Sequence, residues 1–272
     1  MRGGGIGAAL SHLGSLEDFA GADTPIGRVD PRAKLVSTAA FLLAVASYGR
    51  YELSALLPLA LYPATLLALG DVRVGPILWR IAIASPLAVL VGVANPFLDR
   101  APVGRVGPFL VTAGMVSFAS ILVRFVLSVS AALLLVATTG LHSVASALAF
   151  FRVPRVLVTQ LLFLYRYLFV LSGELARSLR AHALRSPSRP VPSLRVAGSM
   201  LGQVLLRTVD RAQRIHSAML CRGFDGEVRL RRPARARPAD FAFAAAWCAF
   251  FWLARSFDLP RLLGAALAGR AP

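Results

Sequence analysis

Apolar residues form long runs along the chain, and short polar segments rich in glycine, proline and charge separate these runs. Four runs precede Gly140, at residues 33–49, 53–70, 76–95 and 110–139. Each is close to the roughly 20 residues that an α-helix needs to cross the hydrocarbon core of a bilayer. A further run, Phe241 to Leu253, carries two tryptophans, which favour the membrane interface. The pattern predicts an all-α, polytopic integral membrane protein with about five transmembrane helices.

The same pattern divides the chain into parts. We expect an N-terminal interfacial segment at residues 1–32, four transmembrane helices at 33–140, cytoplasmic or interfacial helices at 141–237, a last transmembrane helix at 238–258 and a tail at 259–272. Asp30, Pro31 and Arg32 predict the start of the first membrane helix, because Asp caps helix N-termini and Pro suits the first helical position.

The apolar run at 156–172 is interpreted differently. It precedes the segment from Glu174 to Arg237, which holds roughly half of the arginines and four acidic residues. Basic residues accumulate on the cytoplasmic side of membrane proteins. An N-terminus held inside by Arg28, Arg32 and Lys34, followed by four spans, places this segment in the cytoplasm. We therefore expect residues 156–172 to lie along the inner membrane boundary and not to cross the bilayer.

Two arginines fall within the expected spans. A charge inside the hydrocarbon core is costly and often functional. Arg80 and Arg124 are each placed within a turn or two of a span end, from which a long arginine side chain can reach the interface. We expect a structural role for both.

The composition narrows the possible functions. Of the 272 residues, 57% are hydrophobic and 16% are charged, which excludes an ordinary soluble domain. The formal net charge of +17 would suit a nucleic-acid binder, but the basic residues cluster between apolar runs, as in membrane-flanking segments. We therefore expect contact with a lipid bilayer and none with nucleic acid.

Motifs for catalysis are absent from the sequence. It contains no Walker-type phosphate loop, no HExxH motif and no paired carboxylates, and its four histidines lack metal-ligand spacing. The two cysteines, Cys221 and Cys248, form no CxxC motif and predict no disulfide framework. We expect no catalytic residue, no bound cofactor and no metal site.

The basic segment contains two similar amphipathic helices. In the second, one face carries Arg207, Arg211, Arg214, Ala218 and Arg222. Its other side carries Leu205, Val209, Ala212, Met219 and Leu220. This helix should end at Gly223, which tolerates the left-handed conformation. The first helix repeats the pattern, with Ala181, Arg185 and Ser186 in place of Ala218, Arg222 and Gly223. A solvated basic face beside a well-capped helix end would also explain such a pattern.

These residues resemble the transmembrane coupling component of energy-coupling-factor ABC importers, in its cobalt-type, CbiQ-like branch. The resemblance rests on residues 16–20 leading to 30–35, and more specifically on residues 210–226, and the order of elements agrees over nearly the whole chain. In that family, two Ala-Arg-Gly signatures end two cytoplasmic coupling helices, and each arginine docks in a groove of an ATPase subunit. The resemblance implies ATPase contacts at Arg185, Arg222, Ala181, Ser186, Ala218, Cys221 and Gly223.

Two positions depart from the family pattern. Cys221 stands where the second signature usually has alanine, and Ser186 stands where the first usually has glycine. Arg177 or Arg180 could share the role of Arg185.

The resemblance implies a non-catalytic subunit of the bacterial inner membrane, with its N-terminus and coupling helices in the cytoplasm. Its expected partners are two ATP-binding-cassette ATPase subunits, which bind the ATP, and a cobalt-type substrate-binding membrane subunit, which a small accessory membrane subunit could accompany. The expected function is to transmit ATP-driven motion for uptake of cobalt or nickel. The alternatives are a vitamin-type importer, a lipid-acting membrane enzyme, and a membrane-anchored binder of polyanions.

Overall fold

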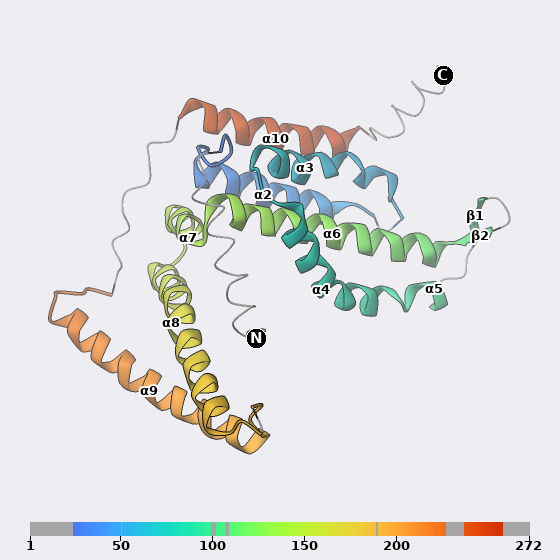
Figure 1. The fold of residues 1–272 in the computed structure, drawn as a ribbon. Coiled ribbons are helices and arrows are strands. Elements are labelled where there is room, and N and C mark those ends of the chain that lie inside the picture. The colour runs from blue at the N-terminus through green and yellow to red at the C-terminus, as the bar shows by residue number, and fades with distance from the viewer. Residues whose placement is uncertain are drawn as a thin grey trace. The chain divides into compact units, whose positions relative to one another are not determined.

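The computed structural model describes residues 24–49, 51–98, 102–106, 109–188, 190–226 and 237–257. The chain divides into two compact units (Figure 1). Residues 19–140 and 234–272 form the bundle unit, and residues 1–18 and 141–233 form the arginine-rich unit. Residues 1–23 of the expected interfacial segment and the expected tail at 259–272 lie outside the described residues.

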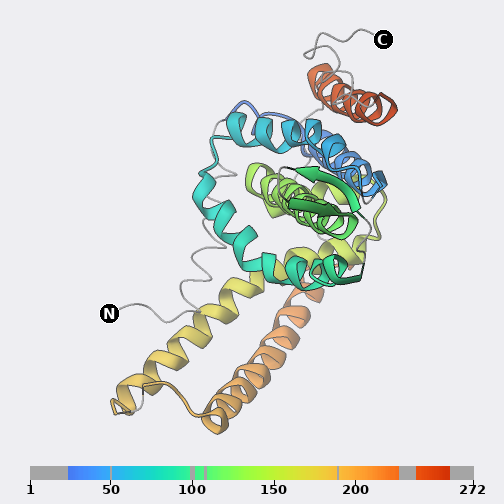
Figure 2. The ribbon, with the colours of Figure 1, turned by 90° about the vertical axis from the view of Figure 1, so that its right-hand side faces the viewer.

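The bundle unit is built around one long helix, α6 (Ala113–Thr139). Four helices contact α6, namely α2 (Pro31–Ser47), α3 (Leu61–Leu69), α4 (Val74–Gly92) and α5 (Asn95–Leu98). The last helix, α10 (Pro238–Ser256), packs against α2. Figure 2 shows α6 in the middle of this arrangement, with α2 to α5 around it. The predicted fold class, a helical polytopic membrane protein, is confirmed.

Aromatic side chains join α2, α3 and α10 in the core of the bundle unit. The ring centroid of Tyr62 lies 4.9 Å from those of Phe41 and Trp247, and 5.5 Å from that of Phe251. The buried Tyr62 hydroxyl lies within hydrogen-bond distance of two side-chain oxygens of α2, Thr38 Oγ1 at 2.7 Å and Ser37 Oγ at 3.1 Å. A buried hydroxyl needs such partners, so this cluster fixes α3 against α2 at a defined register.

Three helices among the described residues are long and apolar enough to cross a membrane, namely α4, α6 and α8 (Arg155–Arg185). The first two correspond to the predicted runs at 76–95 and 110–139. The run at 53–70 is not one helix, because it forms the 3-10 turns η1 (Ser54–Leu56) and η2 (Pro58–Ala60) followed by α3. Proline fits a first helical turn but not a helix interior, so Pro58 and Pro63 divide this run. By length and composition α8 is also a candidate span.

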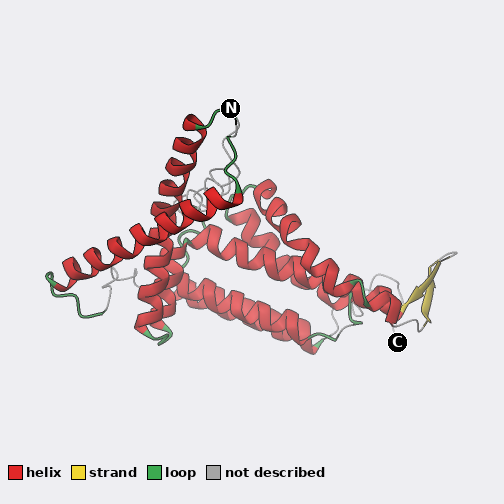
Figure 3. Ribbon diagram, turned by 90° about the horizontal axis from the view of Figure 1, so that it is seen from below, coloured by secondary structure: helices red, strands yellow, loops and turns green. Residues whose placement is uncertain are grey.

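The predicted loop at 96–108 contains regular structure. α5 occupies its start, and β1 (Pro102–Val106) then pairs antiparallel with β2 (Phe109–Thr112), with Gly104 opposite Val111 and Val106 opposite Phe109. Figure 3 shows this hairpin (yellow) at one end of the helical bundle unit. The hairpin leads directly into α6, and the described chain is otherwise helical or loop.

The two arginines within the expected spans lie at different distances from the starts of their helices. Arg80 lies six residues after Val74, less than two turns inside α4, as expected. Arg124 lies about three turns from the start of α6. Its guanidinium donates to the backbone carbonyl of Gly49, just after α2, so the charge has a backbone partner at the end of that helix.

The arginine-rich unit consists of α7 (Leu141–Phe150), α8 (Arg155–Arg185) and α9 (Leu194–Leu220) in the described part of the chain. α7 packs against α8, and α8 packs against α9. Three prolines lie in residues 186–193 and prevent one continuous helix. α8 and α9 therefore form an antiparallel pair joined at one end, as Figure 1 shows.

Candidate functional site

The C-terminal end of α9 has a Schellman geometry. Gly223 adopts a left-handed conformation with φ of 77°, its N–H donates to Leu220 O, and the N–H of Phe224 donates to Met219 O, each at 3.0 Å. These are the two bonds that satisfy the last carbonyls of a helix ending in an αL glycine. Arg222 is the residue immediately before this reversal and is exposed. The sequence pattern had placed the helix end at Gly223.

The C-terminal end of α8 closes differently. Arg185 is its last helical residue, and Ser186 follows with φ of −132°, its N–H donating to His182 O at 3.0 Å. Because this backbone is not left-handed, the position does not require glycine. The serine that departs from the family signature therefore fits the local geometry without strain.

The predicted contact positions gather at two separate places on the helix pair. Ala181 and Arg185 are exposed near the connection to α9, where Ser186 is half-buried. A second group lies at the other end of α9, where every member is exposed: Ala218, Cys221, Arg222 and Gly223. The two groups lie at opposite ends of α9, whose 27 residues span about 40 Å. Within the described residues, neither Arg185 nor Arg222 forms an ion pair.

Between these two ends, Glu174 pairs with two of the arginines of α9. It is the one acidic residue of α8, and its side chain is only 12% exposed. Its Oε2 lies 3.4 Å from Nη2 of Arg211, and its Oε1 lies 3.7 Å from Nη1 of Arg207. Two arginines of the expected basic face of α9 therefore form ion pairs with Glu174 of α8. Sequence reasoning missed Glu174, and the available signal was a single acid in a helix with five arginines.

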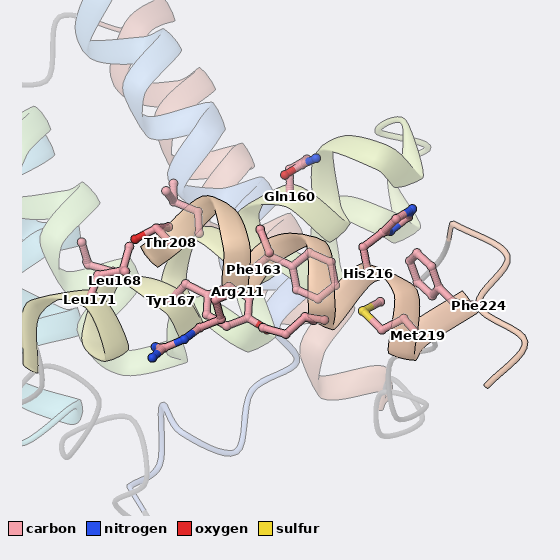
Figure 4. A pocket seen from close by; sticks show the side chains of 13 residues that line it. Gln160, Phe163, Tyr167, Leu168, Leu171, Thr208, Arg211, His216, Met219 and Phe224 are labelled. Carbon is pink, nitrogen blue, oxygen red and sulfur yellow. The ribbon is translucent and has the colours of Figure 1, made fainter. Parts of the chain in front are cut away.

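A cavity of about 460 Å³ lies between α8 and α9. Its walls are mainly apolar, and its lining includes Phe163, Tyr167 and Leu171 from α8 and Thr208, Arg211, Ile215, His216 and Met219 from α9. Figure 4 shows Met219 and Phe224, the residues joined by the Schellman bond, beside each other at one end of this cavity. The position of Arg222 is thus coupled to the packing of α9 against α8.

The predicted apolar side of α9 is divided in the structure. Ala212 and Met219 line the cavity toward α8. Leu205, Val209 and Leu220 are instead exposed, at 64%, 46% and 54%. α9 therefore keeps a second apolar surface that α8 does not cover.

The predicted helix start lies in the bundle unit. α2 begins at Pro31, and Asp30 is its N-cap residue, with Asp30 Oδ1 accepting from the N–H of Arg32 at 2.8 Å. Among the described residues, no group of three or more His, Cys, Asp or Glu side chains is placed to hold a metal ion.

Comparison with known proteins gives the family. A protein of Methanocaldococcus jannaschii described as uncharacterized, MJ1571, is 29% identical over 118 residues. That match covers 43% of this chain and 40% of the length of the relative. The CbiQ family model, described as a cobalt transport protein, matches residues 22–232, which is most of the sequence. The chain therefore belongs to the CbiQ family of cobalt transport proteins.

Proposed function

We propose that this protein is the coupling subunit of an energy-coupling-factor ABC importer, transmitting the motion of two ATPase subunits to a substrate-binding membrane subunit. One observation carries the proposal. Two exposed arginines, Arg185 and Arg222, each end a long helix, and the length of α9 lies between them on one helix pair. Two separated tips on one chain suit two copies of an ATPase better than a single partner.

The chemistry of the tips supports docking to a protein groove. The planar guanidinium of arginine can make two parallel hydrogen bonds to a carboxylate or several to backbone carbonyls, so it fixes orientation as well as position. The exposed apolar surface of α9, with Leu205 and Val209, supports contact with a membrane partner, because such surfaces mark interaction sites. Ala181, Ser186, Ala218, Cys221 and Gly223 are proposed as the small residues that allow close approach of the ATPase subunits.

The arrangement in the membrane is part of the proposal. We propose that the arginine-rich unit and the N-terminus lie on the cytoplasmic side of a bacterial inner membrane, because the positive-inside rule favours that orientation. In this proposal α8 lies along the inner boundary of the bilayer, and the alternative is that α8 crosses the membrane, for which it is long and apolar enough. The proposed cargo is cobalt or nickel, bound by the substrate-binding membrane subunit, and a vitamin-type cargo is the alternative.

The test is reconstitution of the full chain with its ATPase and substrate-binding subunits in proteoliposomes. Arg222→Ala and Arg185→Ala should each reduce ATPase association and ATP-dependent uptake of Co²⁺ or Ni²⁺, while insertion into the membrane is retained. Arg214→Ala is the matched control, because Arg214 is exposed on α9 two turns before Arg222. Full ATPase association and uptake by both tip variants would refute the proposal.

A further inference from the structure

Lys34 closes the end of the central helix of the bundle unit. Its side chain is 1% exposed, and its Nζ donates to the backbone carbonyl of Thr138 at 3.0 Å, in the last turn of α6. The last carbonyls of a helix have no partner within the helix, and a cation at this end complements the helix dipole. Lys34 of α2 therefore acts as a C-terminal cap for α6, 104 residues away.

Asp240 joins the starts of two other helices at the same place. Its Oδ2 accepts from the N–H of Arg237 at 2.7 Å, which caps α10, and its Oδ1 accepts from the N–H of Asp30 at 3.0 Å, at the N-cap of α2. Asp240 is 6% exposed and Asp30 is 7% exposed. Lys34 follows the N-cap residue Asp30 by four residues, about one turn of α2. Lys34, Asp30 and Asp240, named here the three-helix joint, thus hold the start of α2, the start of α10 and the end of α6.

The chain leaves and re-enters the bundle unit beside this joint. Gly140 directly follows α6 and is the last residue of the bundle unit before the arginine-rich unit. The return connection, after residue 233, leads to the start of α10 at Pro238. One connection therefore starts at the end of α6, and the other leads into the start of α10. Both of these helix ends are capped by residues of the joint.

We propose that Lys34 and Asp240 are positioning residues that tie these two connections to one body, so that displacement of the arginine-rich unit moves α2, α6 and α10 together. Terminal turns of helices fray when their polar groups lose their partners. Without the joint, a pull on either connection unwinds a single helix end and is not transmitted to the bundle. This inference rests on the proposed coupling function.

The other end of the α2–α6 pair offers a matched comparison. There Arg124 of α6 donates to the carbonyl of Gly49, which follows α2, so a cation again bonds a backbone carbonyl at a helix end. That carbonyl lies at the opposite end of α2 from Lys34, about 20 Å away along the 15 residues between them. It adjoins neither the connection that follows α6 nor the one that precedes α10.

The experiment uses the complete complex in proteoliposomes with Co²⁺ or Ni²⁺, and compares Lys34→Met, Lys34→Arg, Asp240→Asn and Arg124→Met. We expect Lys34→Met and Asp240→Asn to keep ATPase association and ATP hydrolysis but to lose about fivefold or more of the uptake per ATP. Lys34→Arg should recover part of this ratio, and Arg124→Met should leave the ratio unchanged.

Unchanged uptake per ATP in Asp240→Asn would overturn the proposal, and so would an equal loss of this ratio in Arg124→Met. If Lys34→Met fails to assemble, Asp240→Asn decides, because asparagine keeps the size of the side chain but has one acceptor oxygen for the two N–H groups of Asp30 and Arg237 and turns a donor NH2 toward the other. Failure of the coupling function itself would be visible separately, as a wild-type complex without ATPase subunits or an Arg222→Ala variant with full uptake.

Discussion

Glu174 of α8 and Arg211 of α9 form an ion pair with 3.4 Å between Oε2 and Nη2. Arg207 reaches the other carboxylate oxygen at 3.7 Å. The carboxylate is largely buried while the two arginines are partly exposed, at 62% for Arg207 and 38% for Arg211. One acid thus holds two successive turns of α9 against α8 at a point between the arginine tips.

Glu174→Gln should loosen this helix pair. Loss of the carboxylate leaves Arg211 next to a neutral amide, at a cost of roughly 1–2 kcal/mol, between the values for an exposed pair and a buried one. We expect a broader distribution of distances between spin labels placed on α8 and α9, and less uptake per ATP. Asp210→Asn is the control, since Asp210 is exposed beside Arg211. An equally broad distribution in the control would contradict the assignment to Glu174.

Gly223→Ala should distort the tip that carries Arg222. Both Gly223 and Gly202 have open space around an added Cβ, so only the backbone distinguishes them. At Gly223, with φ of 77°, alanine costs about 1–2 kcal/mol. At Gly202, inside α9, alanine should gain about 0.8–1 kcal/mol of helix propensity. Thermal unfolding followed by circular dichroism in detergent should therefore shift in opposite directions, and shifts of the same sign would refute the role of the left-handed turn.

Arg222→Lys separates charge from shape at the α9 tip. Lysine keeps the positive charge but cannot make the parallel pair of hydrogen bonds that a guanidinium makes. The loss of one charge-assisted bond, about 1.5 kcal/mol, predicts a roughly tenfold weaker association with the ATPase subunit. Titration of the detergent-solubilised protein with purified ATPase measures this, and wild-type affinity in the lysine variant would show that charge alone suffices.

Ser186→Gly restores the residue that is usual in the family signature. Because φ of Ser186 is −132°, glycine offers no relief of strain there. We expect ATPase association and uptake of this variant to equal those of the wild type. A clear increase in either quantity would mean that the α8 tip adopts a left-handed turn when the ATPase is bound.

The family model and the fold support different parts of the interpretation. The chain's membership of the CbiQ family rests on a match over residues 22–232, to a family model described as a cobalt transport protein. The proposed coupling role concerns the two arginine tips and the three-helix joint.

Features that depend on neighbouring residues along the chain were predictable from the sequence. Hydrophobic runs of bilayer length predicted α4 and α6, a capping aspartate and a proline predicted the start of α2, and a glycine after an amphipathic stretch predicted the end of α9. Each of these signals comes from a few consecutive residues, because a helix and its caps are set by local backbone conformation and side-chain periodicity.

The pairs of polar groups that meet across the fold became visible only with the packing of the helices. Lys34 and Thr138, Asp240 and Asp30, and Glu174 and Arg211 are far apart in sequence, and no periodic pattern links them. The partner of Arg124 likewise depends on neighbours in space, because the Gly49 carbonyl is 75 residues away. A buried charge needs a partner. Which group becomes its partner depends on how the helices pack, and no local pattern in the sequence indicates this.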